Sequence, residues 1–170
     1  MMMTRKQQGV AIGMVAGTVC TVLILAYPIR WFSASVPTDA AARIAFALRA
    51  DTIAMMWLLI AIANVARKRF FSPSDIDGSA SPSADLRIDV AVVQNTLEQA
   101  VLASVLYLSL ASLPQEDGVS MIPPLLMLFC LGRLTFWIGY HVGGSWRAFG
   151  FATTFYPTVF GYAFLALRLF

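Results

Sequence analysis

Charged, cysteine and histidine residues are all scarce in this chain of 170 residues. Only 12% of the residues are charged, whereas soluble domains carry about 25%. The two cysteines, Cys20 and Cys130, both lie in apolar runs and form no C-x-x-C pair, so the sequence gives no support to a disulfide framework or a zinc site. With His141 as the single histidine, we predict no metal site.

Basic residues are also thinly spread. The chain has twelve Lys and Arg and a net charge of +3, but no basic cluster is dense enough to suggest nucleic acid as a partner. We expect these charges to orient the protein in a membrane instead.

Apolar residues make up 59% of the chain and are collected in five runs. The runs cover about residues 10–27, 52–66, 90–113, 122–141 and 149–170. Crossing the hydrocarbon core of a bilayer takes about 20 apolar residues in a helix. We therefore predict an all-α integral membrane protein with five spans, whose first partner is the lipid bilayer.

The first run has two interpretations, a signal peptide and an uncleaved anchor helix. Ser33, Ala34 and Ser35 resemble a cleavage region, but the apolar stretch is longer than an ordinary signal core and ends well before them. We favour the anchor. Gly13 and Gly17 form a G-x-x-x-G pair, which permits close approach of another helix.

The second run belongs to one long predicted helix. Thr38 or Asp39 can cap its start, and neither Gly nor Pro follows before Pro73. We expect it to be interfacial near residues 40–50, with Arg49 and Asp51 at the outer membrane boundary, where long side chains reach water.

The connections between spans are polar. Residues 72–87 form a Ser-, Asp-, Pro- and Gly-rich loop, and LPQEDG (113–118) and HVGGSWR (141–147) read as short turns. Basic residues alternate between the two sides of the five spans, as the positive-inside rule requires. A cytoplasmic N-terminus and a non-cytoplasmic C-terminus follow. The residues used are Arg5, Lys6, Arg67, Lys68, Arg69, Arg87 and Arg147.

Polar residues interrupt the first half of the third run. On a helix, Gln94 and Asn95 project from the same side as Glu98, within about two turns of the cytoplasmic end. In the fourth run Arg133 and Tyr140 also share one face. Since intramembrane charges avoid lipid, we predict an ion pair between Glu98 and Arg133 inside the bundle.

Three functions fit such a polar group to different degrees. The side chains can act only as cross-links between helices, or they can bind a polar ligand, because they gather at one end and offer more donors and acceptors than one ion pair needs. A small transporter fits poorly, since no span is broken at mid-membrane by paired Gly or Pro.

Four elements together resemble the MAPEG superfamily, the membrane-associated proteins in eicosanoid and glutathione metabolism. They are RKRFFSPSD (67–75) after a span, N-x-x-E at Asn95 and Glu98, GR-x6-Y from residue 132 to Tyr140, and Arg147 before the last span. The resemblance covers roughly residues 48–170 and leaves residues 1–47 as an added anchor helix and connecting segment.

The resemblance implies a four-helix bundle that forms a homotrimer, binds glutathione near the cytoplasmic face and acts on lipophilic small molecules as a transferase or peroxidase. Asn95 and Glu98 would contact glutathione, with Gln94 beside them. Arg133 would hold the site and Tyr140 would contact the peptide. Arg147 is the candidate catalytic residue, because a cation near sulfur favours the thiolate.

Three positions depart from the family pattern. Ala91 and Gln94 stand where several members are basic, and Phe136 stands where some have a histidine. Fewer cations predict weaker glutathione binding or a different ligand, so a non-catalytic bundle with a structural or interaction role remains the alternative.

Overall fold

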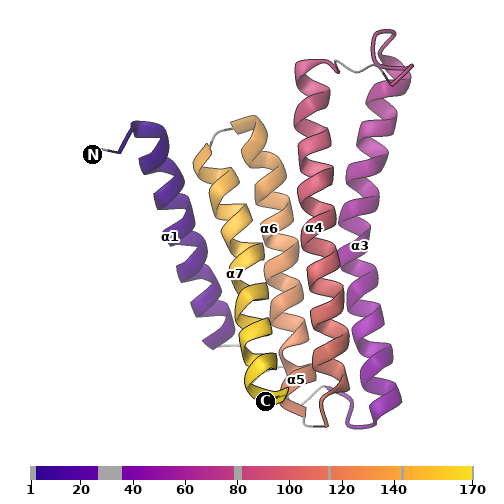
Figure 1. Cartoon of the computed structure of the whole chain (residues 1–170), viewed down its shortest axis with the longest axis vertical. Coiled ribbons are helices and arrows are strands. Elements are labelled where there is room, and N and C mark those ends of the chain that lie inside the picture. Colours follow the sequence, from indigo (N-terminus) through magenta and orange to yellow (C-terminus); the bar gives the residue numbers. More distant parts are fainter. Residues whose placement is uncertain (1–2, 27–35, 79–81, 115, 143, 170) are drawn as a thin grey trace.

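The computed structural model describes residues 3–26, 36–78, 82–114, 116–142 and 144–169. Within these ranges all regular secondary structure is helical (Figure 1). The elements are α1 (Arg5–Ala26), α3 (Ala40–Phe71), α4 (Ala84–Ser112), α5 (Glu116–Ser120), α6 (Ile122–Val142) and α7 (Gly144–Leu169).

The five long helices lie side by side and alternate in direction along the chain, so the N- and C-termini lie at opposite ends (Figure 1). Their order in space is α1, α7, α6, α4, α3, with extensive packing of α1 on α7, α7 on α6 and α3 on α4. The predicted all-α architecture is confirmed, with α1 added outside the other four helices.

The long helix α3 begins where its sequence predicts. The side chain of Asp39 accepts a hydrogen bond from the backbone N–H of Ala42 at 2.9 Å, which satisfies one of the free donors at a helix start. At about 1.5 Å per residue, its 32 residues exceed the thickness of a hydrocarbon core.

Polar contacts at both ends hold the antiparallel pair α3 and α4 together. At one end, Lys68 Nζ lies 2.6 Å from Asp85 Oδ2 and 2.5 Å from Asp89 Oδ2. At the other end, the Arg43 guanidinium donates to the carbonyl of Pro114 at 3.1 Å. The apolar core lies between these ends and is centred on Leu106, Tyr107, Leu110, Leu128 and Phe129.

Three predicted connections include residues that belong to helices in the structure. Residues 84–87 of the predicted loop already form the first turn of α4, because Ser83 caps it by accepting from Leu86 N at 3.3 Å. The segment after α4 contains the short helix α5. Residues 144–147 of the predicted last turn form the start of α7, so Arg147 lies in a helix.

Small residues let α1 approach α7 closely, as the G-x-x-x-G pair predicts. A Cβ atom added at Gly17 would lie 2.7 Å from Ala152 Cβ, and one at Gly13 would lie 3.1 Å from Ala148 Cβ. The suggested cleavage region at residues 33–35 lies outside the described residues.

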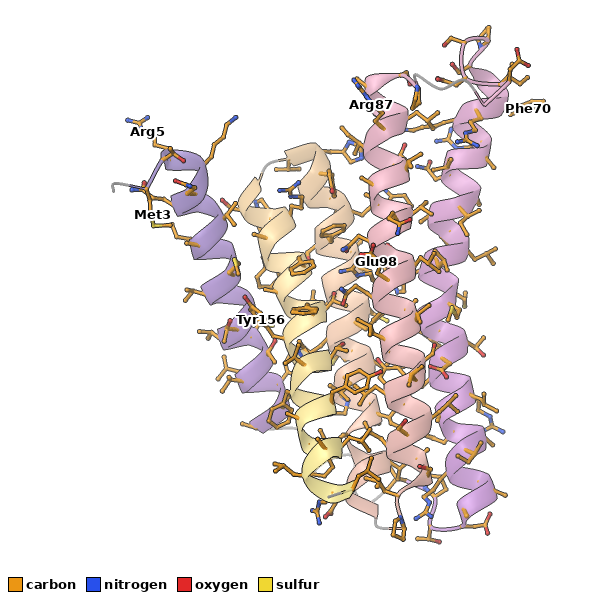
Figure 2. All side chains as sticks on the ribbon, viewed as in Figure 1. Met3, Arg5, Phe70, Arg87, Glu98 and Tyr156 are labelled. Carbon is orange, nitrogen blue, oxygen red and sulfur yellow. The ribbon has the colours of Figure 1, made fainter. Side chains whose placement is uncertain are left out.

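Among the described residues, three segments are long and apolar enough to cross a membrane: Arg5–Ala26, Ala40–Phe71 and Asp117–Val142. Arg5 and Arg87 lie at the same end of the bundle, as Phe70 does (Figure 2). The grouping agrees with the predicted alternation, while sidedness in the membrane stays a prediction.

Asp51 corrects one expectation. The sequence interpretation put it at a membrane boundary where side chains reach water. Its side chain is instead only 8% exposed, and its Oδ1 has no hydrogen-bond partner among the described residues, while its depth in a membrane stays a prediction. The reason is that Asp51 sits on the face of α3 that packs against the bundle, among the buried positions Ala47, Ala50 and Ala54.

Candidate functional site

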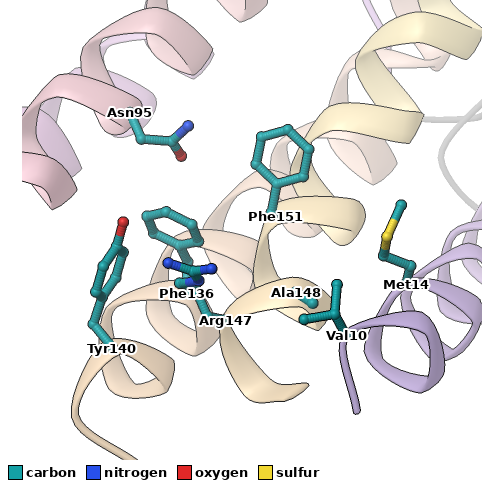
Figure 3. A pocket seen from close by; sticks show the side chains of 8 residues that line it. All are labelled: Val10, Met14, Asn95, Phe136, Tyr140, Arg147, Ala148 and Phe151. Carbon is teal, nitrogen blue, oxygen red and sulfur yellow. The ribbon is translucent and has the colours of Figure 1, made fainter. Parts of the chain in front are cut away.

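A pocket of about 300 Å³ lies between the four helices α1, α4, α6 and α7 (Figure 3). Three of the predicted site residues line it: Asn95 from α4, Tyr140 from α6 and Arg147 from α7. Its other described lining residues are Val10, Met14, Phe136, Ala148 and Phe151. The structure therefore brings Asn95 of α4 close to Arg147 of α7, which lies 52 positions later in the sequence.

Arg133 lies directly behind this pocket and is only 2% exposed. Its NH1 group donates to Asn95 Oδ1 at 2.8 Å, while Nε and NH2 donate to Thr154 Oγ1 at 3.2 and 3.0 Å. The Thr154 hydroxyl donates a hydrogen bond to the carbonyl of Gly150 at 3.0 Å, which leaves its oxygen lone pairs free to accept from Arg133. Arg133 thus connects α4, α6 and α7.

Aromatic rings complete the surroundings of Arg133. Its guanidinium carbon lies 4.7 Å from the centre of the Phe136 ring and 5.9 Å from that of Phe129. Such contacts are attractive because the ring face is electronegative. Phe136 therefore serves as a packing partner for the buried cation.

Close approach of α6 and α7 makes this network possible. Cβ atoms added at Gly132 or Gly150 would collide with the backbone or side chains of the facing helix. Glycine at both positions lets the two backbones meet, so that Arg133 reaches Thr154 within hydrogen-bond distance. Gly139 faces the backbone of Arg147 in the same way.

The predicted ion pair between Glu98 and Arg133 is wrong for the single chain. Glu98 is exposed, and its Oε1 accepts from Gln94 Nε2 at 3.0 Å on the surface of α4 (Figure 2). No ion pair joins Glu98 to Arg133 in the described part of the chain. The reason is the rotation of α4 about its axis, which turns Asn95 toward Arg133 and leaves Gln94 and Glu98 on the surface of the bundle.

Arg147 provides the positive charge of the pocket. Its guanidinium carbon lies 5.1 Å from the centre of the Tyr140 ring, and Tyr140 in turn meets Phe136 edge to face at 5.1 Å. No described carboxylate lies within ion-pair distance of Arg147. The pocket therefore pairs an uncompensated cation with an amide, a phenol and apolar walls.

Sequence reasoning missed several residues of the site. Thr154 occurs in an apolar run, where threonine carries no special signal. Val10 and Met14 belong to the added helix, whose contact with the pocket could be found only through the small-residue face of α1. Phe151 follows Arg147 by one helical turn, a spacing that places both on one side.

Comparison with known proteins identifies the family of this bundle. A model of the MAPEG family matches residues 44–167, well over half of the chain. The chain belongs to the MAPEG family. Its all-α membrane bundle is therefore a MAPEG bundle, preceded in this protein by α1.

Two curated relatives are similar to part of this MAPEG protein. Transmembrane protein 79 of Bos taurus and of Mus musculus are each 31% identical over 80 residues, which is 45% of this chain and 20% of the relative. The match thus spans about a fifth of the length of these relatives. No solved structure matches the chain.

Proposed function

We propose that this MAPEG protein is a membrane-bound, glutathione-dependent transferase that acts on lipophilic electrophiles. The observation that supports the proposal is the pocket where Arg147, Asn95 and Tyr140 converge. A tripeptide with two carboxylates, amides and a thiol needs a cation and neutral hydrogen-bonding groups in one place, and this pocket supplies both.

Each polar residue of the pocket has a role in the proposal. The guanidinium of Arg147 is free of a described counter-ion and attracts the thiolate or a carboxylate of glutathione. Asn95, whose Oδ1 is engaged by Arg133, offers its amide N–H groups, and the Tyr140 hydroxyl donates or accepts. Arg133 holds Asn95 in place and contacts no ligand in this scheme.

The exposed pair Gln94 and Glu98 has a role only in an assembly. Both are exposed on α4 in the single chain. In the homotrimer that the family resemblance implies, a neighbouring copy would cover this surface and Glu98 would receive the ammonium group of glutathione. This assignment is part of the proposal, as is the trimer itself.

The chemistry is nucleophilic attack by sulfur. A nearby cation lowers the pKa of a thiol and raises the fraction present as thiolate. The thiolate sulfur forms a bond with the electrophilic carbon, the electron pair displaced from that carbon moves onto the leaving atom or the conjugated carbonyl, and the thiol proton ends on that atom or in solvent. With a hydroperoxide, sulfur attacks the distal oxygen, the O–O bond breaks, and the released alkoxide takes up a proton to leave as the alcohol. A second glutathione thiol then displaces water from the sulfenic acid and forms the disulfide.

A non-catalytic bundle is the second candidate, and one observation favours it. All hydrogen bonds of Arg133 are made to Asn95 and Thr154 within the chain, so the conspicuous intramembrane charge needs no ligand. In this case the pocket would be a by-product of packing, and the protein would have a structural or interaction role.

Calorimetric titration of the purified protein with glutathione separates the two functions. The proposal predicts saturable binding at millimolar glutathione that Arg147→Gln weakens at least about tenfold, as expected when a charged contact worth about 1.4 kcal/mol or more is lost. Arg87→Gln is the matched control, because Arg87 is exposed at the same end of the bundle and outside the pocket. Absence of saturable binding in the parent protein would leave the structural role.

A further inference from the structure

A second cavity, of about 390 Å³, lies between α1 and α7 and contains no charged residue in its described lining. Its volume falls in the range of small-molecule sites, about 300–1,000 Å³. We call it the α1–α7 groove; it is lined by Thr18, Thr21, Val22, Leu25, Ala26, Tyr156 and Phe160.

The threonine hydroxyls of the α1–α7 groove already donate hydrogen bonds within their own helix. Thr18 Oγ1 donates to the carbonyl of Met14 at 2.9 Å, and Thr21 Oγ1 donates to that of Gly17 at 2.9 Å. Tyr156 then has the one remaining hydroxyl among the described lining residues. A charged or strongly polar ligand would find no compensation there, whereas an uncharged aliphatic chain would.

Both walls of the groove continue into the pocket at Arg147. On α1, Met14 lines the pocket and Thr18, four residues further, lines the groove, so the two side chains share one face of the helix. On α7, the ring of the pocket residue Phe151 stacks on Phe155 at 5.2 Å. Phe155 meets the groove residue Tyr156 at 6.1 Å.

We propose that the α1–α7 groove binds the aliphatic chain of the second substrate, an uncharged linear molecule whose reactive end lies near Met14 and Phe151. This inference rests on the proposed function, since it names the substrate class of the same site. It also gives α1 a specific role, because five of the seven described groove residues come from this helix.

Shape must select the chain, because lipid tails are as apolar as the groove and burial alone gives no advantage over the bilayer. A linear chain can follow a path between two helices, whereas a compact ring system cannot extend along it. Longer chains should therefore react better than short ones up to the length of the groove, and residues that fill the groove should remove this preference.

A pair of 2-alkenals tests the inference. Addition of glutathione to a 2-alkenal needs no further reactant. The thiolate sulfur bonds to the β-carbon, the double-bond electrons move toward the carbonyl oxygen, and the enolate takes up the thiol proton. Rates with glutathione are measured for trans-2-dodecenal and trans-2-hexenal in the same nanodiscs. The ratio of the two kcat/KM values is compared between variants, so that partitioning into the bilayer cancels.

Thr18→Trp should fill the groove and lower the dodecenal-to-hexenal ratio on the order of tenfold, the size expected for loss of chain contacts in a hydrophobic site. Val22→Phe, one helical turn beyond Thr18 in the groove lining, should also lower the ratio. Val19→Trp is the matched control, because Val19 is 52% exposed and lies outside the groove lining. It should leave the ratio unchanged.

Different results identify which proposal fails. Equal ratios in the parent, Thr18→Trp and Val22→Phe, with normal hexenal turnover, would overturn the groove assignment and leave the proposed function intact. Absence of turnover with either alkenal would overturn the reaction. Cross-linking with an alkyl diazirine then tests the groove alone: labelling of α1 and α7 that Thr18→Trp abolishes supports a chain-binding groove, and labelling that it leaves unchanged overturns it.

Discussion

Replacing Thr154 with valine should destabilise the bundle, although threonine and valine are both small and uncharged. The effect should arise through Arg133. Valine keeps the volume of threonine but removes the oxygen that accepts from both Nε and NH2 of Arg133. Thr154 is 1% exposed, so water cannot replace the lost acceptor. Arg133 would keep only Asn95 as a hydrogen-bond acceptor in the described part of the chain.

The size of the effect follows from the two contacts. A hydrogen bond to a charged group contributes about 1.5–3 kcal/mol, and a buried donor left without a partner costs a similar amount. Because the two bonds share one oxygen and Arg133 can readjust, we expect a loss of about 3 kcal/mol in the free energy of unfolding.

Thr153→Val is the matched control. Thr153 is also buried on α7, but its hydroxyl bonds only to the carbonyl of Phe149 in its own helix, at 2.8 Å. Such back-bonding adds little to stability, so the control should lose less than about 1 kcal/mol. Reversible unfolding in mixed micelles, followed by circular dichroism, measures both. A Thr154→Val variant no less stable than Thr153→Val would refute the role of Thr154 as the anchor of Arg133.

Three further predictions concern other parts of the chain. Gly17→Leu should separate α1 from α7, because even a Cβ at Gly17 would lie 2.7 Å from Ala152 Cβ. In a chain that carries the pair Gly9→Cys and Ser145→Cys, Gly17→Leu should abolish disulfide formation between the two cysteines. Ile12→Leu, the control, should leave this disulfide unaffected. The Ser72 hydroxyl, followed by Ser83 N–H, lowers the pKa of Asp75 below 3.8. Ionised Asp75 therefore stabilises the loop fully above pH 3.8, and amide protection at Ser83 should disappear as pH falls through the lowered pKa, but show no such transition in Asp75→Asn. A reporter fused at the C-terminus should be non-cytoplasmic, and a cytoplasmic signal would mean that the spans were miscounted.

Elements with strong local signals were predictable from the sequence. The fourth apolar run, 122–141, became α6 (Ile122–Val142), because a double proline starts it and polar residues end it. The start of α3 at Asp39 followed from capping chemistry. Convergence of Asn95 and Tyr140 followed from their positions near one end of adjacent spans, and Arg147 was added to them by the family resemblance.

Features that depend on helix rotation and on partners far along the chain were not predictable. Charge matching suggested Glu98 for Arg133, but the rotation of α4 brings Asn95 instead, and the second acceptor is Thr154 on α7. A threonine in an apolar run does not reveal that it accepts from an arginine 21 residues away. The contribution of Val10 and Met14 likewise depends on where α1 docks, which its glycines permit but do not specify.

Thiolate formation by bound glutathione tests the proposed function most directly. Purified protein is titrated with glutathione at neutral pH while the ultraviolet absorbance of the thiolate is followed, in the parent and in Arg147→Ala and Arg87→Ala. The proposal predicts a saturable rise in absorbance in the parent and in Arg87→Ala, and a greatly reduced rise in Arg147→Ala, since the cation beside sulfur is lost. An equal rise in all three would contradict the role of Arg147, and no rise in any of them would contradict the glutathione site itself.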